Sequence, residues 1–308
     1  MEDLIYNGNL NDFETFADSD AGITKGSWNL RALKYFHLLG ATASGFNLAY
    51  YQAKDLVAKG FADPQLLPIT ASLFSSNEQG AIYIPKPIVN NKQSLYQDAD
   101  GTTPVTADGD PVGRMLDQSG NGYHAIQTVS GRRPVYRTDG TLHWLEGDGI
   151  DDFLQNTAVN FVMETSSTLV AGLENKTRSQ GIFKAGESGV GTGDRFILFR
   201  VSNSSFAAGD EGTSIYNFGI PANTPFLTEI HHRFSGVDFI LDGTTKESTV
   251  TNIGSVPVTN DIILFATRSD IQFLDGRFYG AIMRTPEMSS EDKVASREYL
   301  ANLSGVTL

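Results

Sequence analysis

The stretch that decides the fold runs from Ser94 to Gln155. It contains SLYQDADGTTPVTADGDPVGRMLDQSGNGYHAIQ (94–127) and RRPVYRTDGTLHWLEGDGIDDFLQ (132–155). Asp-Gly occurs in it four times, at Asp100-Gly101, Asp108-Gly109, Asp139-Gly140 and Asp148-Gly149. Asp and Gly tolerate the left-handed backbone of tight turns, and short apolar runs separate these turns. The stretch is therefore predicted to be antiparallel β structure.

The rest of the chain after Asn91 continues this pattern. Further strands are predicted at residues 167–173, 181–184, 195–201, 213–218, 228–234, 237–241, 244–251, 262–267 and 277–284. Asp242-Gly243 marks a hairpin between two of them. So many short strands with frequent turns indicate two packed antiparallel sheets. A final helix is expected to begin after a cap at Ser289 or Ser290 and to end before Gly305.

Residues 1–91 differ from the rest of the chain. Ser27 is a candidate cap for a helix at 28–39, and Ser44 for a second helix that ends before Gly60. The prolines of FADPQLLPITASLF (61–74) are expected to interrupt any regular element there, and Pro85 and Pro87 mark a boundary. This aromatic-rich region is either a small, partly helical subdomain or a segment that docks to neighbouring subunits.

The composition of the chain excludes several classes of function. The 308 residues carry a net charge of −13, which argues against nucleic-acid binding because that depends on basic side chains. There is no cysteine, so disulfides, thiolate zinc sites and cysteine nucleophiles are excluded. The start MEDLIYNGNL lacks the basic and apolar regions of a signal peptide, and no run is long enough to insert into a membrane.

The segments at 94–127 and 132–155 also carry a resemblance. In their order and spacing they resemble the concanavalin A-like, laminin G-like jelly-roll domains of tailed-bacteriophage virion proteins, as does FLDGRFYGAIMRTPEMSSEDKVASREYLANLSGV (273–306). The resemblance implies an all-β, concanavalin A-like jelly-roll sandwich at residues 92–308, preceded by a partly helical docking region at 1–91. It also implies a virion protein that is made in the host cytoplasm.

Glu146 and Asp148 are the first carboxylates to consider for catalysis. Laminarinase-type hydrolases on this fold place their nucleophile and acid four residues apart on one strand, with another carboxylate between them. Here the third position is Ile150. Retaining chemistry needs two carboxyl groups about 5–5.5 Å apart, so no catalytic residue is assigned and the chain is predicted not to be an enzyme.

Calcium is the alternative role for the acidic loops. The candidate ligands are Asp117, Asp148, Asp151 and Asp152, because Ca²⁺ takes six to eight oxygens from such loops. Asp98, Asp100, Asp108 and Asp110 are also available. No EF-hand loop is present, and Asp in Gly-rich loops more often forms Asx-turns. The favoured prediction is therefore no metal and no cofactor, with calcium as the alternative.

Histidines and aromatics give no clearer site. His231 and His232 are adjacent, so on a strand they face opposite sides and do not chelate one ion together. His124 and His143 are expected to be structural. Residues 186–196 are read as a long hairpin loop. The aromatics considered for stacking on a sugar ring are Tyr123, Tyr136, Trp144 and Tyr216.

The function predicted from these features is a non-enzymatic structural protein of a phage particle. Its amino-terminal region would dock to the virion, and its sandwich would face outward for host-surface adhesion. Its partners would be other virion proteins, copies of itself and a host-surface glycan. The alternatives are a carbohydrate-binding lectin and, less favoured, a glycoside hydrolase.

Overall fold

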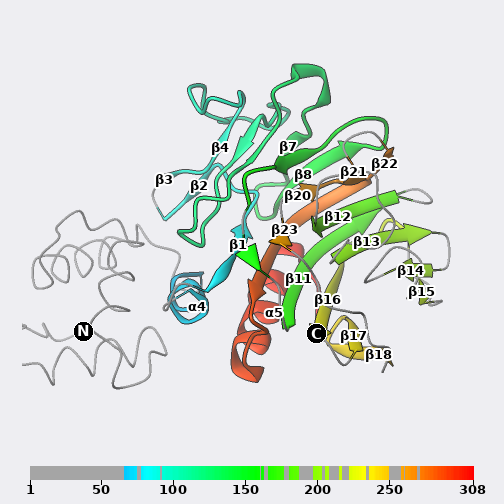
Figure 1. Cartoon of the computed structure of the whole chain (residues 1–308). Helices are drawn as coiled ribbons and strands as arrows, with labels where there is room; N and C mark the ends of the chain where they lie inside the picture. Colours follow the sequence, from blue (N-terminus) through cyan, green and yellow to red (C-terminus); the bar gives the residue numbers. More distant parts are fainter. Residues whose placement is uncertain are drawn as a thin grey trace, which may run out of the picture. The chain divides into compact units, whose positions relative to one another are not determined.

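A computed structural model describes much of the chain after residue 65. The described residues are 66–74, 78–90, 92–159, 161–162, 166–176, 180–186, 197–202, 205–207, 215–216, 222–233, 236–249, 258–259, 261–268 and 271–308. Most of them lie in antiparallel strands (Figure 1). The predicted all-β class is thereby confirmed.

The first large sheet has eight strands. Seven follow one another in the order β18 (Thr244–Thr249), β17 (Gly236–Leu241), β16 (Phe226–Arg233), β11 (Ser166–Asn175), β23 (Asp275–Thr285), β8 (His143–Asp148) and β7 (Val135–Thr138). The eighth, β1 (Gln79–Tyr83), pairs with the second half of β23, whereas β8 pairs with its first half. The long β23 therefore pairs with two strands from the first half of the sequence.

The second large sheet has nine strands. Their order is β15 (Ile215–Tyr216), β14 (Ser205–Ala207), β13 (Ile197–Ser202), β12 (Gln180–Gly186), β20 (Asp261–Leu264), β9 (Leu154–Asn156), β6 (Ala125–Ile126), β5 (Arg114–Met115) and β4 (Leu95–Tyr96). Short pairs join β2 (Ile88–Val89) to β3 (Lys92–Gln93), β10 (Phe161–Val162) to β19 (Val258–Thr259), and β21 (Ala266–Arg268) to β22 (Ile271–Phe273). One 3₁₀ turn, η1, spans Ser130–Arg132.

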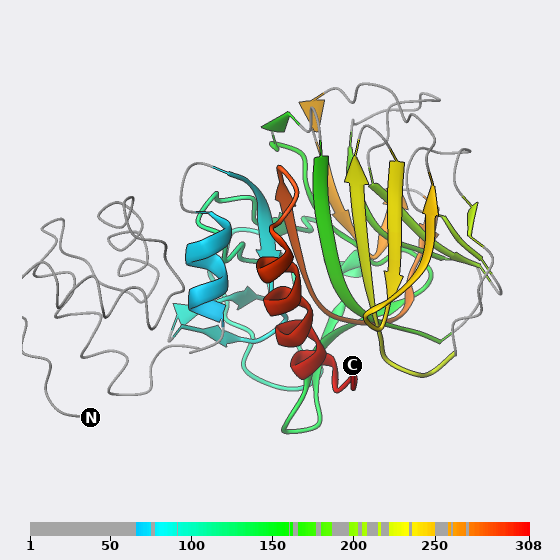
Figure 2. The same cartoon turned by 90° about the horizontal axis from the view of Figure 1, so that it is seen from below.

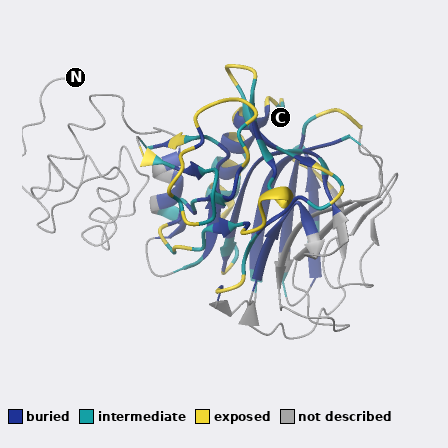
Figure 3. Ribbon diagram, turned by 90° about the horizontal axis from the view of Figure 1, so that it is seen from above, coloured by how far each residue is buried: buried dark blue, intermediate teal, exposed yellow. Residues whose placement is uncertain are grey.

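The core follows from alternation along the strands. Leu145 of β8 and Phe278 of β23 belong to one buried apolar cluster together with Leu154 and Ile262 of the second sheet. Successive side chains of a strand point to opposite faces, so the neighbours of Leu145 and Phe278 lie on the outer face of the first sheet. Figure 3 shows the buried residues along the strands and the exposed residues in the connecting loops.

Helix α5 (Ser290–Ser304) packs against β11, β16 and β23 (Figure 2). The Ser289 hydroxyl accepts a hydrogen bond from the Asp292 N–H, and Gly305 ends the helix with a φ of 72°. Both predicted ends are therefore confirmed. A Cβ on Gly172 of β11 would lie 3.3 Å from the Ser304 Cβ, so glycine there lets the helix approach the sheet closely.

The four Asp-Gly turns are also confirmed. The glycines Gly101, Gly109, Gly140 and Gly149 all have φ between 73° and 92°. The hairpin between β17 and β18 turns at Asp242 and Gly243, which have φ of 46° and 73°. Positive φ at both central residues of a two-residue loop matches the twist of the flanking strands.

One expectation about the amino-terminal region is wrong. Helix α4 spans Leu66–Leu73 and contains Pro68, where an interruption was predicted. Proline is tolerated in a first helical turn because the N–H groups there have no partner within the helix. The helix predicted at 28–39 and the one predicted between Ser44 and Gly60 lie outside the described residues.

The chain divides into two compact units. One is Met1–Glu78 with Val89–Lys92, and the other is Gln79–Ile88 with Gln93–Leu308. Strand β1 thus belongs to the unit of the sandwich, although the sequence placed it before the boundary at residues 91 and 92. Within the described ranges, no helix is long and apolar enough to cross a membrane.

Candidate metal centre

Three of the four predicted calcium ligands meet in the turn between β8 and β9. Asp148 ends β8, and Asp151 and Asp152 lead into β9. Ligand oxygens of the three carboxylates lie within 4.8 Å of one another. Asp148 is exposed, Asp151 is half-buried and Asp152 is only 6% exposed, so the group reaches from the surface into the sandwich.

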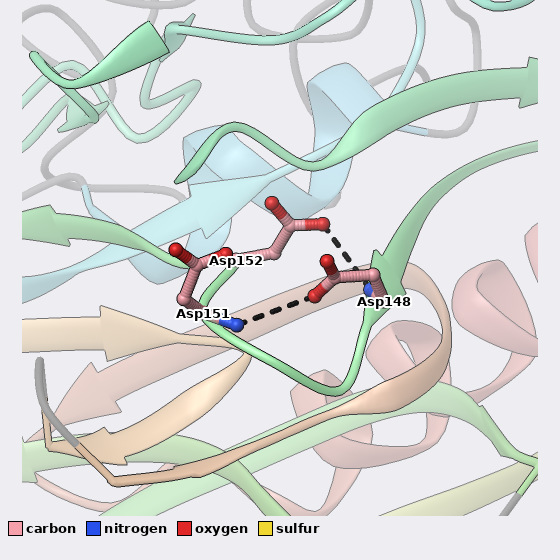
Figure 4. Close-up of side chains that lie close together, drawn as sticks. All are labelled: Asp148, Asp151 and Asp152. Atoms are coloured by element: carbon pink, nitrogen blue, oxygen red, sulfur yellow. Dashed lines mark hydrogen bonds between the residues drawn. The ribbon is translucent and has the colours of Figure 1, made fainter. Parts of the chain in front are cut away.

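The backbone of the turn fixes the side chains of Asp148 and Asp152 (Figure 4). The Asp148 Oδ1 accepts hydrogen bonds from the N–H groups of Ile150 at 2.8 Å and Asp151 at 3.3 Å. The Asp152 Oδ2 accepts one from the Asp148 N–H at 3.1 Å. Gly149 has a φ of 73°, and a Cβ there would lie 2.6 Å from the Asp275 Cβ. The turn therefore needs glycine for its conformation and for its contact with β23.

The electrostatics of the turn favour a cation. Burial, then the charge of Asp148, raises the pKa of Asp152 to about 7, although the Asp148 N–H opposes this shift. Asp151 faces one cation, the Arg132 Nε at 3.5 Å. A cation among the three carboxylates would remove their mutual repulsion and stabilise the ionised form of Asp152.

The donor set fits calcium. All three side chains offer hard carboxylate oxygens, which suit Ca²⁺, and no histidine or sulfur ligand belongs to the group. One oxygen of Asp148 and one of Asp152 already accept backbone hydrogen bonds. Ca²⁺ takes six to eight oxygens, so carbonyl groups, water or hydroxyl groups of a bound molecule would complete the shell.

Asp117 does not join this group. It is 7% exposed, and its Oδ1 accepts hydrogen bonds from the N–H groups of Ile82 and Ser119 at 2.9 and 2.8 Å. Its Oδ2 accepts from the Ser119 hydroxyl at 2.7 Å and from the Tyr123 N–H at 3.1 Å. Burial raises the pKa of Asp117, although these four bonds lower it. Asp117 is a buried structural anchor.

Other loop aspartates also accept hydrogen bonds from the backbone. Asp98 accepts hydrogen bonds from the N–H groups of Thr102 and Thr103, and Asp110 accepts from those of Thr106 and Ala107. The Asp108 Oδ1 accepts from the Thr138 N–H. Asp98 and Asp110 thus hold hydrogen bonds within their own loops, whereas Asp108 joins its loop to Thr138, 30 residues later.

Glu146 lies on the same face of β8 as Asp148, but both of its oxygens are ion-paired. Its Oε2 lies 3.0 Å from the Arg137 Nε, and its Oε1 contacts the Lys176 ammonium group. These cations lower the pKa of Glu146 against the effect of burial. Ile150, at the third position of the hydrolase pattern, is 73% exposed in the turn. The spaced carboxylate pair of that pattern is therefore absent from β8.

The histidines and aromatics occupy mostly structural positions. The His124 Nδ1 accepts a hydrogen bond from the Asp117 N–H, and the His143 Nδ1 lies 2.6 Å from the Tyr136 hydroxyl. His231 is buried, with its Nε2 2.5 Å from the Glu229 Oε1. Tyr123 packs against the apolar core. The side chain of Tyr216 and the loop at 187–196 lie outside what the structure describes.

Sequence reasoning missed a charged row on the outer face of the first sheet. Arg277 of β23 lies opposite Glu146 of β8 on one side and opposite Glu174 of β11 on the other. These three residues are far apart in the sequence, so only the strand register brings them together. The alternation of side chains along each strand predicts which residues share a face of the sheet. It does not show which strand is the partner.

No protein-family model matches the chain, and no curated protein matches it. Solved structures do. A GH54 α-L-arabinofuranosidase soaked with a cyclic sulfate inhibitor aligns at 14% identity and a TM-score of 0.55, over 74% of this chain and 63% of its own length. An arabinofuranosidase complexed with arabinofuranosyl-α-1,2-xylobiose aligns at 15% identity and a TM-score of 0.51, over 74% and 62%.

A Trypanosoma rangeli sialidase in complex with 2,3-difluorosialic acid aligns at 10% identity and a TM-score of 0.50. The alignment covers 83% of this chain and 40% of the sialidase. This chain therefore spans less than two thirds of the length of each of these three proteins. At such identities the likeness shows a shared β fold.

These matches correct the prediction that the chain is not an enzyme. That prediction rested on the broken carboxylate spacing of one hydrolase pattern, whereas these three solved structures are enzymes. The absence of one motif on β8 is thus no ground for excluding catalysis. The likeness assigns no reaction to this chain, because fold alone does not fix function.

Proposed function

We propose that the sandwich binds a carbohydrate through a calcium ion held by Asp148, Asp151 and Asp152. The observation that carries the proposal is the approach of three carboxylates to within 4.8 Å at an accessible turn. Without a cation, ionised Asp152 is disfavoured by burial and by Asp148. With Ca²⁺ the same three side chains become ligands.

The exposure of the turn supports a calcium ion that binds a ligand over one with a purely structural role. Asp148 and Ile150 are exposed, so the outer side of a bound ion would face solvent. Neighbouring hydroxyl groups of a sugar are neutral oxygen donors of the kind that complete a calcium shell. Ile150, 73% exposed, would add an apolar contact beside the ion.

We place this domain on a tailed-phage particle, a setting that rests on the sequence resemblance at residues 94–155 and 273–306. In this proposal the amino-terminal region docks to other virion proteins and to copies of the chain, and the sandwich faces the host surface. Many copies on one particle would multiply a weak affinity for each glycan. Cofractionation of the full chain with intact particles tests the setting.

The binding experiment is a glycan array probed with the full chain in calcium and in EDTA. Asp148→Asn should abolish the calcium-dependent signals. Asp139→Asn is the matched control, because Asp139 accepts the same kind of turn hydrogen bonds, from Thr141 and Leu142, and belongs to no group of three clustered carboxylates within the described residues. Signals that survive both EDTA and Asp148→Asn would refute the proposal. Released sugar is measured in the same incubations, since enzymes are built on this fold.

A further inference from the structure

The outer face of the first sheet carries a strip of charged side chains on adjacent strands. We call it the cationic strip, and it consists of Arg137, Glu146, Glu174, Lys176 and Arg277 around Trp144. On each of β7, β8, β23 and β11 the adjacent residue belongs to the apolar core, namely Tyr136, Leu145, Phe278 and Leu173. Alternation therefore directs the strip outward on all four strands, which lie side by side (Figure 1).

Each cation of the strip contacts at least one carboxylate, so a bound anion would have to replace one of these partners. The carboxylate of Glu146 forms ion pairs with both Arg137 and Lys176. The Arg277 Nη1 lies 3.3 Å from the Glu174 Oε2, which also accepts a hydrogen bond from the Tyr279 hydroxyl at 3.2 Å. Arg137 has a further partner in Asp108 at 3.2 Å. Three cations thus share three carboxylates, in a chain whose net charge is −13.

Two donors in the strip have no acceptor. The Arg277 Cζ lies 4.6 Å from the centroid of the Trp144 ring, so the guanidinium group stacks on the indole. Within the described part of the chain, neither the Trp144 Nε1 nor the Arg277 Nε makes a hydrogen bond. Trp144 is only 9% exposed, and an unsatisfied buried donor is costly. Both nitrogens are shielded from solvent, so a ligand on this face would meet the exposed part of the Arg277 side chain and not these two atoms.

The strip is accessible and adjoins the metal centre. The side chains of Lys176, Arg277 and Arg137 are 30%, 32% and 38% exposed. Trp144, Glu146 and Asp148 alternate on one face of β8, so the strip and the metal centre form one continuous surface. A chain-like ligand bound at the turn would extend along this face.

We infer that the cationic strip binds the carboxylate groups of an acidic polysaccharide, which compete with Glu146 for Lys176 and Arg137 and meet Arg277. This inference deepens the proposed function and rests on it, since it names the class of carbohydrate. The net negative charge of the chain repels a polyanion. Binding of an acidic polysaccharide therefore depends on a local group of cations. Arginine and lysine bind carboxylates through charge-assisted hydrogen bonds.

The test uses polygalacturonate as the acidic probe and dextran as the neutral one, with the full chain in calcium and in EDTA. The double variant Arg137→Gln/Lys176→Gln should bind polygalacturonate about tenfold more weakly, because two charge-assisted contacts are lost. Lys92→Gln, an exposed cation outside the strip, should bind as the unaltered chain does. Glu146→Gln should bind more tightly, because it releases two cations while keeping the side-chain shape. Thermal unfolding shows whether each variant is folded.

A purely structural ion-pair network predicts a different pattern. It predicts lower stability for Glu146→Gln and for the double variant, with unchanged polygalacturonate binding, and that result would overturn the inference. Equal binding of dextran would overturn it as well. Binding that is lost in EDTA but kept in the double variant places the ligand at the metal centre alone, which supports the proposed function and overturns the inference.

Discussion

The carboxylate of Asp117 accepts a hydrogen bond from the backbone N–H of Ile82 at 2.9 Å. This contact joins strand β1 to a loop 35 residues later, and the Gln118 N–H donates back to the Ile82 carbonyl at 2.8 Å. The Asn121 Nδ2 also donates to the Gly80 carbonyl at 2.9 Å. The segment DQSGNGYH (117–124) is thus hydrogen-bonded to β1, the first strand of the sandwich.

Asp117→Ala is expected to lower the free energy of unfolding by about 3 kcal/mol, because four donors lose a buried acceptor. Chemical denaturation followed by circular dichroism measures the change. Asp100→Ala, at an exposed position in another loop, should change stability by less than about 0.5 kcal/mol. Equal effects of the two substitutions would show that Asp117 is not an anchor.

Gly80→Ala is expected to disrupt the pairing of β1 with β23. Gly80 has a φ of 144°, and a Cβ there would lie 2.0 Å from the Met283 carbonyl oxygen. Gly131 provides the control, since a Cβ there meets nothing within 4 Å. Hydrogen exchange should show loss of protection at Ala81 and Tyr83, the β1 residues that alternate with Ile82 and face β23, in Gly80→Ala and normal protection in Gly131→Ala. Unchanged protection in both would contradict this pairing.

The position of β1 also predicts where the chain can be shortened. A protein that begins at Glu78 retains β1 and should unfold cooperatively, whereas one that begins at Asn91 lacks it. The second should expose Ile282 and Met283, which are buried, and should aggregate or unfold at lower temperature. Thermal unfolding and sizing of the two proteins compare them directly. Identical behaviour would mean that β1 is dispensable.

Calcium affinity at the metal centre should depend on pH through Asp152. Its pKa of about 7 in the folded chain means that a proton competes with the ion, so binding should be about tenfold weaker at pH 6 than at pH 8. Without metal, the folded state binds more protons than the unfolded state between about pH 4 and pH 7. Stability should therefore fall as pH rises through that window.

Calorimetric titration with calcium measures the first effect, and denaturation at several pH values the second. Asp152→Asn should abolish calcium binding and should flatten the pH dependence of stability in the same window. Calcium affinity that stays equal at pH 6 and pH 8 would show that Asp152 is not a ligand.

Several local features could be predicted from the sequence because they depend on neighbouring residues. The turns at Gly101, Gly109, Gly140 and Gly149 need a left-handed backbone, and Asp-Gly supplies it. The cap at Ser289 and the end at Gly305 likewise involve contacts within one turn of helix. The grouping of Asp148, Asp151 and Asp152 belongs to the same class, because one turn places all three.

The sequence by itself determined the all-β class, most of the strand positions and the acidic turn, since alternation and turn chemistry act over a few residues. Only the tertiary structure decided that Asp117 is an anchor for β1 and that Arg277 lies between Glu146 and Glu174. It also decided that β1 belongs to the sandwich. Each of these depends on which distant strands pair and in what register. Many pairings of short, similar strands satisfy the same local pattern, and only packing of the whole core selects one.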